Sequence, residues 1–164
     1  MIPISDKLDL NPTTMPTLSE IQAARGPLPA SLSIWTGYLF GRASQQCRAH
    51  FNALVEPLGI QGRHFGLLAV LGEGIPLSQV DLGDRLGIDR NTIVLLLDDL
   101  QRLDLVVRDR DPRDRRAHLV TLTEKGRDAL EKSMEMARRT NEEVLSPLSP
   151  EERDQLHQLL SRLF

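Results

Sequence analysis

The charged segment Arg108–Gly126 constrains the fold of this chain more than any other stretch. It begins with five arginines within nine residues, interleaved with aspartates, and the apolar run His118–Leu122 follows. A short apolar pair, Val106–Val107, stands just before it. Two such runs around a charged centre predict a β-hairpin with an exposed tip. Alone, this tip fits a self-neutralising surface turn as well as a contact with phosphates. Its charged residues are Arg108, Asp109, Arg110, Asp111, Arg113, Asp114, Arg115 and Arg116.

Two short helices with clear start and stop signals precede the hairpin. Ser78 can cap the first, with Asp81 three residues on as in a capping box, and Gly87 ends it. Asp89 can cap the second, which we expect to continue to about Arg102. Helix, tight glycine turn, helix and charged hairpin together predict a winged helix-turn-helix. The expected inner faces consist of Leu82 and Leu86 in the first helix and of Ile93, Leu96, Leu97, Leu100 and Leu103 in the second.

Before this unit, we expect an N-terminal arm and two helices. Residues 1–30 contain five prolines and should form a flexible arm. Apolar residues three or four apart predict one continuous helix over about 31–55, ended by Pro57 and Gly59, and a second helix over 62–71. The apolar stripe of the first helix is expected to be Leu32, Trp35, Leu39, Ala43, Cys47, Phe51 and Leu54.

After the hairpin, two more helices complete the chain. Thr123 can cap a long helix over about 124–145. Ser149, with Pro150 at the first helical position and Glu152 at the third, is a strong start for the last helix. The predicted fold is therefore mainly α, in the order αααα-ββ-αα, with a two-stranded β wing.

Composition limits the function classes. The 164 residues suffice for one domain, and the net charge of −3 means that DNA binding must come from a local basic patch. The single cysteine, Cys47, excludes an internal disulfide or a thiolate zinc site and fits a reducing cytoplasm. No apolar run approaches the roughly 18 residues that span a membrane, and the N-terminus does not resemble a signal peptide. We find no catalytic motif, no metal-ligand spacing and no cofactor motif, so we do not expect an enzyme.

With these residues in view, the chain resembles the MarR (multiple antibiotic resistance regulator) family of bacterial winged helix-turn-helix transcriptional regulators. The resemblance covers roughly residues 32–164. Its most specific part is the wing pattern Asp-x-Arg-x-x-x-(Leu/Val)-x-Leu-Thr-x-x-Gly. That pattern is present here as Asp114, Arg116, Val120, Leu122, Thr123 and Gly126.

The resemblance implies a homodimer that binds a pseudo-palindromic operator in double-stranded DNA. Dimerisation helices would lie at about 31–57 and 124–164, around a winged helix-turn-helix at about 60–123. The helix Asp89–Arg102 would be the recognition helix in the major groove. Arg116, oriented by Asp114, would reach the adjacent minor groove.

Residue chemistry divides the expected DNA contacts into two kinds. Arg113, Arg115 and Arg116 suit phosphates and the minor groove, and Ser78 and Gln79 can bond phosphates from the preceding helix. The first turn of the recognition helix suits base reading. Farther along, Val94 and Leu95 stand where family members often carry a polar or basic residue, and Asp98 and Asp99 add negative charge. The base-reading residues are Arg90, Asn91 and Thr92.

Members of the family often bind small aromatic acids where the dimerisation region meets the winged unit. Trp35, Tyr38 and Arg42 project from similar angles of the first helix, and His64 begins the second. Arg42 or His64 could meet a carboxylate, with Trp35 and Tyr38 against a ring. The alternative is packing of the aromatic residues in a dimer interface. The expected partner is thus a small aromatic or phenolic effector.

Taken together, the sequence predicts a ligand-responsive homodimeric repressor. Two other functions remain open at this point. Cys47 could sense oxidants, although its place on the apolar stripe favours a small core residue. A winged helix used for protein interaction without DNA binding is the second alternative, and the acidic balance with Val94 and Leu95 favours it.

Overall fold

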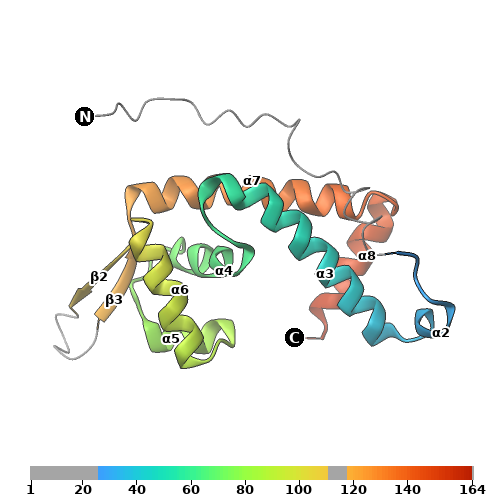
Figure 1. The fold of residues 1–164 in the computed structure, drawn as a ribbon, viewed down its shortest axis with the longest axis horizontal. Coiled ribbons are helices and arrows are strands. Elements are labelled where there is room, and N and C mark those ends of the chain that lie inside the picture. The colour runs from blue at the N-terminus through green and yellow to red at the C-terminus, as the bar shows by residue number, and fades with distance from the viewer. Residues whose placement is uncertain (1–25, 111–117, 164) are drawn as a thin grey trace.

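The computed structural model describes residues 26–110 and 118–163, and helices dominate it (Figure 1). The predicted mainly α fold with a β wing is confirmed, and the sheet is small and antiparallel. In chain order, the elements are α2 (Ala30–Ser33), α3 (Thr36–Val55), the 3-10 turn η1 (Glu56–Leu58), α4 (Gly62–Leu71), β1 (Leu77–Ser78), α5 (Gln79–Leu86), α6 (Arg90–Arg102), β2 (Val106–Arg110), β3 (His118–Leu122), α7 (Glu124–Val144) and α8 (Pro150–Ser161).

Two parts with different packing lie along the long helix α7 (Figure 1). We call residues 60–110 and 118–123 the winged body; it comprises α4, α5, α6 and the sheet. We call residues 30–49, with α2 and most of α3, and residues 150–163, with α8, the helical arm. Figure 1 shows α7 running across the molecule from the winged body to the end that carries α8.

The winged body has one apolar core, to which every element of the body contributes. α4 places Leu67 and Leu68 in it, α6 places Leu97 and Leu100, and all four are completely buried. At roughly 1.5–3 kcal/mol for each fully buried leucine, these contacts stabilise the body without help from a partner. The remaining core residues include Leu71, Leu77, Leu82, Ile93, Leu96, Leu105, Val106, Val120 and Leu122.

The sheet places β3 between the other two strands. β2 pairs with it antiparallel, Val106 opposite Leu122, and β1 pairs on its other side, Leu77 opposite Val120. β1 was not predicted, so the expected order αααα-ββ-αα lacks this strand. With only two residues, this strand is too short to show an alternating pattern. Leu77 is 6% exposed, and its burial in the core holds the strand against β3.

The predicted helix caps are confirmed. Asp81 N donates to Ser78 Oγ and Ser78 N donates to Asp81 Oδ2, each at 3.2 Å, which is the capping box at the start of α5. The Thr123 hydroxyl accepts a hydrogen bond from Gly126 N at 2.9 Å at the start of α7. Gly87 ends α5 with a φ of +63°, a left-handed conformation that glycine adopts without strain.

Gly126 lets α7 begin very close to the first wing strand. A Cβ built on this glycine would clash with the carbonyl oxygen of Leu105. Thr123 N also donates to that oxygen at 3.1 Å, so the backbone approach is part of the turn from β3 into α7. The glycine at the end of the wing pattern is therefore explained by close backbone approach.

The first long helix is not continuous, contrary to the prediction. α2 ends at Ser33, and Trp35, in extended backbone with φ −98° and ψ 107°, precedes the start of α3 at Thr36. Periodic apolar spacing identifies a common face but says nothing about continuity of the backbone. Ile34 and Trp35 are 74% and 62% exposed, so no core contact holds a continuous helix at this point.

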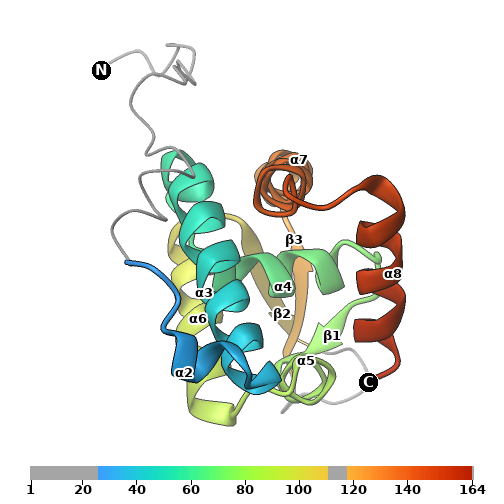
Figure 2. The same ribbon diagram turned by 90° about the vertical axis from the view of Figure 1, so that its right-hand side faces the viewer.

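No side chain of the helical arm is buried in the single chain. α2 and α8 contain no buried residue, and those of α3 are confined to its last six residues, His50–Val55. Figure 2 shows α3 and α8 on opposite sides of α7 and apart from each other. The exposed apolar side chains of the arm are Ile34, Trp35, Leu39, Phe40, Leu159 and Leu163.

Candidate nucleic-acid interface

The first turn of α6 presents the three residues predicted to read bases. Arg90, Asn91 and Thr92 are all exposed. Asp89 precedes them, and its carboxylate accepts hydrogen bonds from the backbone of Asn91 and Thr92, both at 3.0 Å. Hydrogen bonds from Thr92 hold the pKa of Asp89 below its usual value, with a smaller contribution from Asn91. The cap therefore stays charged and fixes the backbone of the turn that carries the three side chains.

Ser78 and Gln79 lie at the start of α5. The Ser78 hydroxyl donates to Asp81 Oδ2 at 2.7 Å and also accepts from the Asp81 backbone. This carboxylate has a lowered pKa, mainly because Ser78 hydrogen bonds to it. Ser78 is thus committed to the cap, and a phosphate would have to replace one of these bonds to reach its hydroxyl. Gln79 is half-buried beside Arg90, where both line a small hollow of about 140 Å³ between α5 and α6.

Two apolar residues in the middle of α6, Val94 and Leu95, have different surroundings. Val94 is partly buried and packs against the core. Leu95 is 66% exposed and points away from the core. Leu95 is therefore the apolar side chain that this helix offers to a groove, where contact with a thymine methyl suits it.

Two adjacent carboxylates attach α6 to different neighbours. Asp98 pairs with Arg108 of β2, which ties the helix to the wing. Asp99 Oδ1 lies 2.7 Å from Arg102, while its Oδ2 lies 3.6 Å from Nε2 of His64 and 3.8 Å from Arg63. The carboxylates of Asp98 and Asp99, which the sequence places on the recognition helix, thus contact the sheet and α4. The sequence contained no local signal for Arg63 or Arg108 in these roles.

The predicted wing contacts lie outside the described residues. Arg113, Asp114, Arg115 and Arg116 all belong to the segment 111–117. The strands on both sides are described, and they align Arg110 of β2 opposite His118 of β3. These paired strand ends direct the chain toward the tip from the same edge of the sheet.

The four predicted effector residues are not brought together within one chain. Trp35 and Tyr38 lie near the start of α3, and Arg42 donates a hydrogen bond to the Gly26 carbonyl at 3.2 Å. His64 lies beyond the other end of that helix: Asn52, ten residues after Arg42, accepts a bond from Gly62 N. Ten helical residues correspond to roughly 15 Å.

His64 is part of the start of α4. It is 3% exposed, and its Nδ1 accepts a hydrogen bond from Gln61 N at 3.0 Å. The ring proton therefore sits on Nε2, which is buried, faces Asp99 and has no hydrogen-bond partner. Burial lowers the pKa of His64, and the nearby Arg63 lowers it further.

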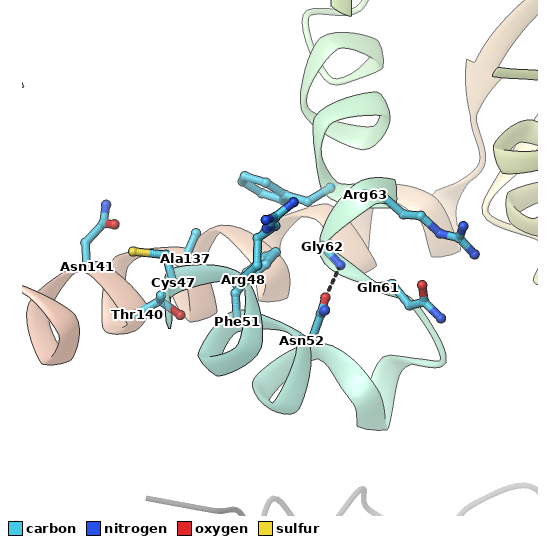
Figure 3. Close-up of a pocket in the computed structure, with 11 residues that line it drawn as sticks. Cys47, Arg48, Phe51, Asn52, Gln61, Gly62, Arg63, Ala137, Thr140 and Asn141 are labelled. Atoms are coloured by element: carbon cyan, nitrogen blue, oxygen red, sulfur yellow. Dashed lines mark hydrogen bonds between the residues drawn. The ribbon is translucent and has the colours of Figure 1, made fainter. Parts of the chain in front are cut away.

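A cavity of about 490 Å³ lies between α3, α4 and α7, and none of the four predicted effector residues lines it (Figure 3). Phe51 and Phe65 form an apolar wall, with ring centroids 5.2 Å apart in an edge-to-face arrangement. Two arginines, Arg48 and Arg63, are its charged lining residues. The remaining lining residues are Cys47, Asn52, Gln61, Gly62, Ala137, Thr140 and Asn141.

Cys47 lines this cavity and is only partly buried. Burial raises the pKa of its thiol, and a raised pKa reduces the fraction of reactive thiolate. The structure therefore gives no support to the alternative of an oxidant sensor. Among residues 26–110 and 118–163, no cluster of three or more histidine, cysteine or acidic side chains could hold a metal ion.

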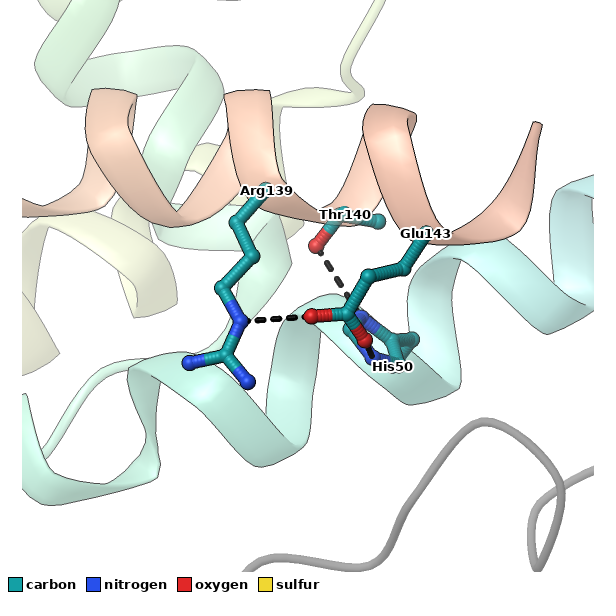
Figure 4. Close-up of polar contacts among 4 residues, drawn as sticks. All are labelled: His50, Arg139, Thr140 and Glu143. Carbon is teal, nitrogen blue, oxygen red and sulfur yellow. Dashed lines mark hydrogen bonds and ion pairs between the residues drawn. The ribbon is translucent and has the colours of Figure 1, made fainter. Parts of the chain in front are cut away.

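A polar cluster joins α3 to α7 beside the cavity (Figure 4). His50 is 3% exposed, and its Nε2 lies 2.8 Å from Glu143 Oε2 while its Nδ1 lies 3.3 Å from the Thr140 hydroxyl. Arg139 donates to the other carboxylate oxygen of Glu143 at 2.6 Å. Arg139, and then His50, lower the pKa of Glu143. These bonds satisfy both ring nitrogens of a histidine that is buried between the helices.

Comparison with known proteins identifies the family to which this arrangement belongs. The MarR family model matches residues 58–117. YkoM of Bacillus subtilis, an uncharacterised HTH-type transcriptional regulator, is 30% identical over 124 residues, which make up 76% of this chain and 80% of the relative. The chain belongs to the MarR family. It spans 64% of the length of two further curated relatives of this kind.

Solved structures of MarR-type regulators share the fold. The transcriptional repressor CouR, bound to a 23-mer DNA duplex, is 31% identical, with a TM-score of 0.76 over 84% of this chain and 99% of CouR. The PcaV transcriptional regulator of Streptomyces coelicolor, in complex with its natural ligand, is 28% identical, with a TM-score of 0.72 over 84% of this chain and 96% of PcaV.

Family membership makes this chain a DNA-binding transcriptional regulator with a winged helix-turn-helix, in a family of regulators rather than enzymes. DNA binding is thereby preferred over the alternative of a winged helix used only for protein interaction. In the described part of the chain, every helix is too short or too polar to cross a membrane.

Proposed function

We propose that this protein is a homodimeric repressor that releases a pseudo-palindromic operator when a small aromatic or phenolic acid binds. The dimer is inferred chiefly from the helical arm, in which no side chain is buried. α8 has a capping box and 12 residues but no buried side chain. Isolated helices of this length are marginal in water, so another surface must cover α8. A second copy of the chain supplies that surface with the same arm.

The apolar residues of the arm support this reading. Trp35 is 62% exposed, and Leu159 and Leu163 are 50% and 63% exposed. Exposed apolar side chains gathered on helices are typical of a protein interface. In the proposed dimer, helices within about 31–57 and 124–164 form the dimerisation region, and residues 60–123 form the winged unit. The predicted N-terminal arm, residues 1–30, is kept as a separate part in this proposal, and its residues 1–25 lie outside the described part of the chain.

On DNA, we assign the recognition role to α6 and the flanking contact to the wing. Arg90, Asn91 and Thr92 would read base edges in the major groove, because their side chains are exposed on the first turn of the helix. Ser78 and Gln79 would contact phosphates at the start of α5. Arg113, Arg115 and Arg116 would contact phosphates and the minor groove, with Asp114 orienting Arg116.

For the effector, the cavity between α3, α4 and α7 is a better candidate than the predicted set alone. Phe51 and Phe65 offer an apolar wall to a ring, and Arg48 offers a cation to a carboxylate. The structure of PcaV in complex with its natural ligand supports ligand control in a similar fold. Trp35, Tyr38, Arg42 and His64 would contribute from outside this cavity, the first three within the dimer interface.

Effector binding would act on the spacing of the two recognition helices. In a two-fold dimer on linear DNA, these helices must match half-sites about 34–36 Å apart. A ligand between the arm and the winged body would tilt each body and spoil the match. Such a ligand must bind the mismatched state more tightly, and DNA must weaken its binding by the same factor.

Selection of DNA from a random-sequence pool is the decisive test. We expect enrichment of a duplex with two inverted half-sites about one helical turn apart. Light scattering should give twice the mass of the 18.4 kDa chain. Recovery of sequences without inverted repeats, or a monomer at micromolar concentration, would contradict the proposal.

A further inference from the structure

Arg63 occupies a position between the cavity and the recognition helix. It is the second residue of α4, and it lines the cavity. Its guanidinium nevertheless extends away from Cys47, Ala137 and Asn141 (Figure 3). It lies instead 3.8 Å from Asp99 of α6. One side chain therefore borders the candidate effector site while contacting the helix that reads DNA.

Asp99 has three cationic or polar neighbours, and Arg63 is the one most easily exchanged. Arg102 is held at 2.7 Å on the same helix. His64 is buried and fixed by its bond from Gln61, so its ring cannot leave. Arg63 is the most distant of the three, at 3.8 Å, and its side chain is 55% exposed. A long pair at such an exposure is weak, so little free energy is lost when it breaks.

The cavity offers Arg63 a better partner once an anion is bound. Its charged lining residues are two arginines, and its wall is formed by Phe51, Phe65 and Ala137. The apolar wall suits the ring of an aromatic carboxylate, and a guanidinium can bind both carboxylate oxygens. Arg48 alone leaves one cation on the cavity, and Arg63 needs only a change of rotamer to supply a second.

We propose that Arg63 is a two-position residue that leaves Asp99 for the carboxylate of a bound aromatic acid and thereby removes one polar contact that helps to hold α6 against α4. The inference rests on the effector cavity proposed above and specifies how its occupation reaches the DNA-binding surface. In the DNA-bound state, Arg63 pairs with Asp99 and α6 is held from two sides, by α4 and by the wing. In the ligand-bound state, the tether between Arg63 and Asp99 is lost, while Asp99 keeps His64 and Arg102 as neighbours and the pair between Asp98 and Arg108 remains.

The two partners of the switch have opposite effects on ligand binding. Arg63→Gln removes the cation and should weaken binding of an acid. Asp99→Asn removes the competitor for Arg63 and should strengthen it. Both substitutions should weaken specific DNA binding, because both break the tether. A simple charge effect predicts the reverse for Asp99→Asn, since loss of a carboxylate near DNA increases attraction to phosphates.

Fluorescence anisotropy and calorimetry can measure both properties on the full-length protein. The DNA probe is a duplex selected with the wild-type protein, and the ligand probes are benzoate and 4-hydroxybenzoate, with benzamide as the uncharged control. We expect the acids to weaken wild-type DNA binding by about fivefold, the lower end of typical coupling factors, because the exposed pair that is lost is weak. In Arg63→Gln and Asp99→Asn, that factor should fall below about twofold. Asp99→Asn should bind the acids more tightly than the wild type, and Arg63→Gln more weakly.

Asp98→Asn is the matched control. It removes the same charge from the adjacent residue of α6 but breaks the wing pair instead. Whatever its effect on DNA affinity, the factor by which the acids release DNA should equal that of the wild type. Circular dichroism and thermal unfolding identify any variant that fails to fold, and Arg63→Lys, which keeps the charge, should retain part of the coupling.

Two results overturn the proposal and are distinguishable. If the acids bind and release DNA from wild type and from Asp99→Asn by the same factor, the effector cavity stands and the role of Arg63 is refuted. If neither acid binds the wild type nor Asp99→Asn, or benzamide acts as well as the acids, the anionic effector cavity fails and the switch fails with it.

Discussion

The winged body and the helical arm follow the same local sequence rules but differ in what completes them. α5 in the body and α8 in the arm each begin with a serine capping box. α5 then buries Leu82 completely in the core, whereas α8 buries nothing. Capping defines where a helix begins, but burial decides whether it is stable alone. The body therefore has a buried core of its own, whereas the arm would be completed by the proposed dimer.

The largest expected effect is on the stability of the winged body. Leu97 is completely buried on α6, and Leu97→Ala should lower the free energy of unfolding by about 2–5 kcal/mol, through lost burial and the cavity left behind. Urea denaturation checks this value. Leu95→Ala on the same helix is the control, because Leu95 is 66% exposed; its effect on stability should stay within about 0.5 kcal/mol. Equal losses in the two variants would refute the packing described for α6.

The second prediction concerns dimerisation through the helical arm. Leu159 is 50% exposed in the single chain, and Leu159→Asp would place a charge in the proposed dimer interface. The dimer dissociation constant should rise by about 30-fold or more, equivalent to about 2 kcal/mol. Sedimentation over a range of protein concentrations measures this change, and DNA binding should weaken with it.

Gln158→Asp is the matched control for this arm variant. It introduces the same charge on the neighbouring position, which a helix of 3.6 residues per turn directs away from the apolar face of Leu156 and Leu160. Dimerisation should be nearly unchanged. If both variants dimerise like the wild type, α8 does not belong to the interface, and the contrast between body and arm loses its explanation.

The third prediction concerns the seam where α4 meets α6. Burial lowers the pKa of His64 below its ordinary value of 6.5. Below about pH 6.5, His64 therefore binds a proton in the unfolded chain but stays neutral in the folded chain. The free energy of unfolding is thus highest above this pH and falls as the pH decreases. The slope from this residue should not exceed about 1.4 kcal/mol per pH unit.

Urea denaturation between about pH 6.5 and 5.5, above the range in which most carboxylates titrate, measures that slope. His64→Gln should flatten it. The exposed His157→Gln, which leaves the buried imidazole in place, should not. A slope of the opposite sign would mean that the folded state favours the charged imidazole, with Asp99 as its partner.

Local signals account for what could be predicted from the sequence. The bounds of α4 and the starts of α5, α6, α7 and α8 follow from caps, glycines and a proline, whose effects extend over a few residues. At the turn into the wing, Asp104 adopts a left-handed backbone with φ 60°, which aspartate tolerates better than most residues. Such features require no knowledge of the rest of the fold.

Features built from distant segments could not be predicted in this way. The cavity combines Cys47 of α3, Phe65 of α4 and Ala137 of α7. Similarly, Asp99 meets Arg63 across 36 positions of the chain. The predicted effector set failed to meet in one chain because helical periodicity aligns residues on a face but not their distance along the axis. The break at Ile34 and Trp35 was missed because periodicity alone does not report the absence of core contacts.

The smallest expected effect compares the two matched caps directly. Ser149 N donates to Glu152 Oε2 at 2.8 Å and Ser149 Oγ accepts from Glu152 N at 3.2 Å, so Ser149→Ala removes half of a capping box like that of Ser78. Each cap is worth about 1 kcal/mol. In the body, Ser78→Ala should lower the free energy of unfolding by this amount at any protein concentration. In the arm, α8 is stable only on its partner, so Ser149→Ala, which both protomers carry, should appear as a dimer weaker by up to about 30-fold, at about 1 kcal/mol for each chain. Sedimentation and urea denaturation of both variants separate the two readouts. If Ser149→Ala instead left the dimer unchanged and lowered stability independently of concentration, α8 would be stable within a single chain, contrary to the contrast drawn here.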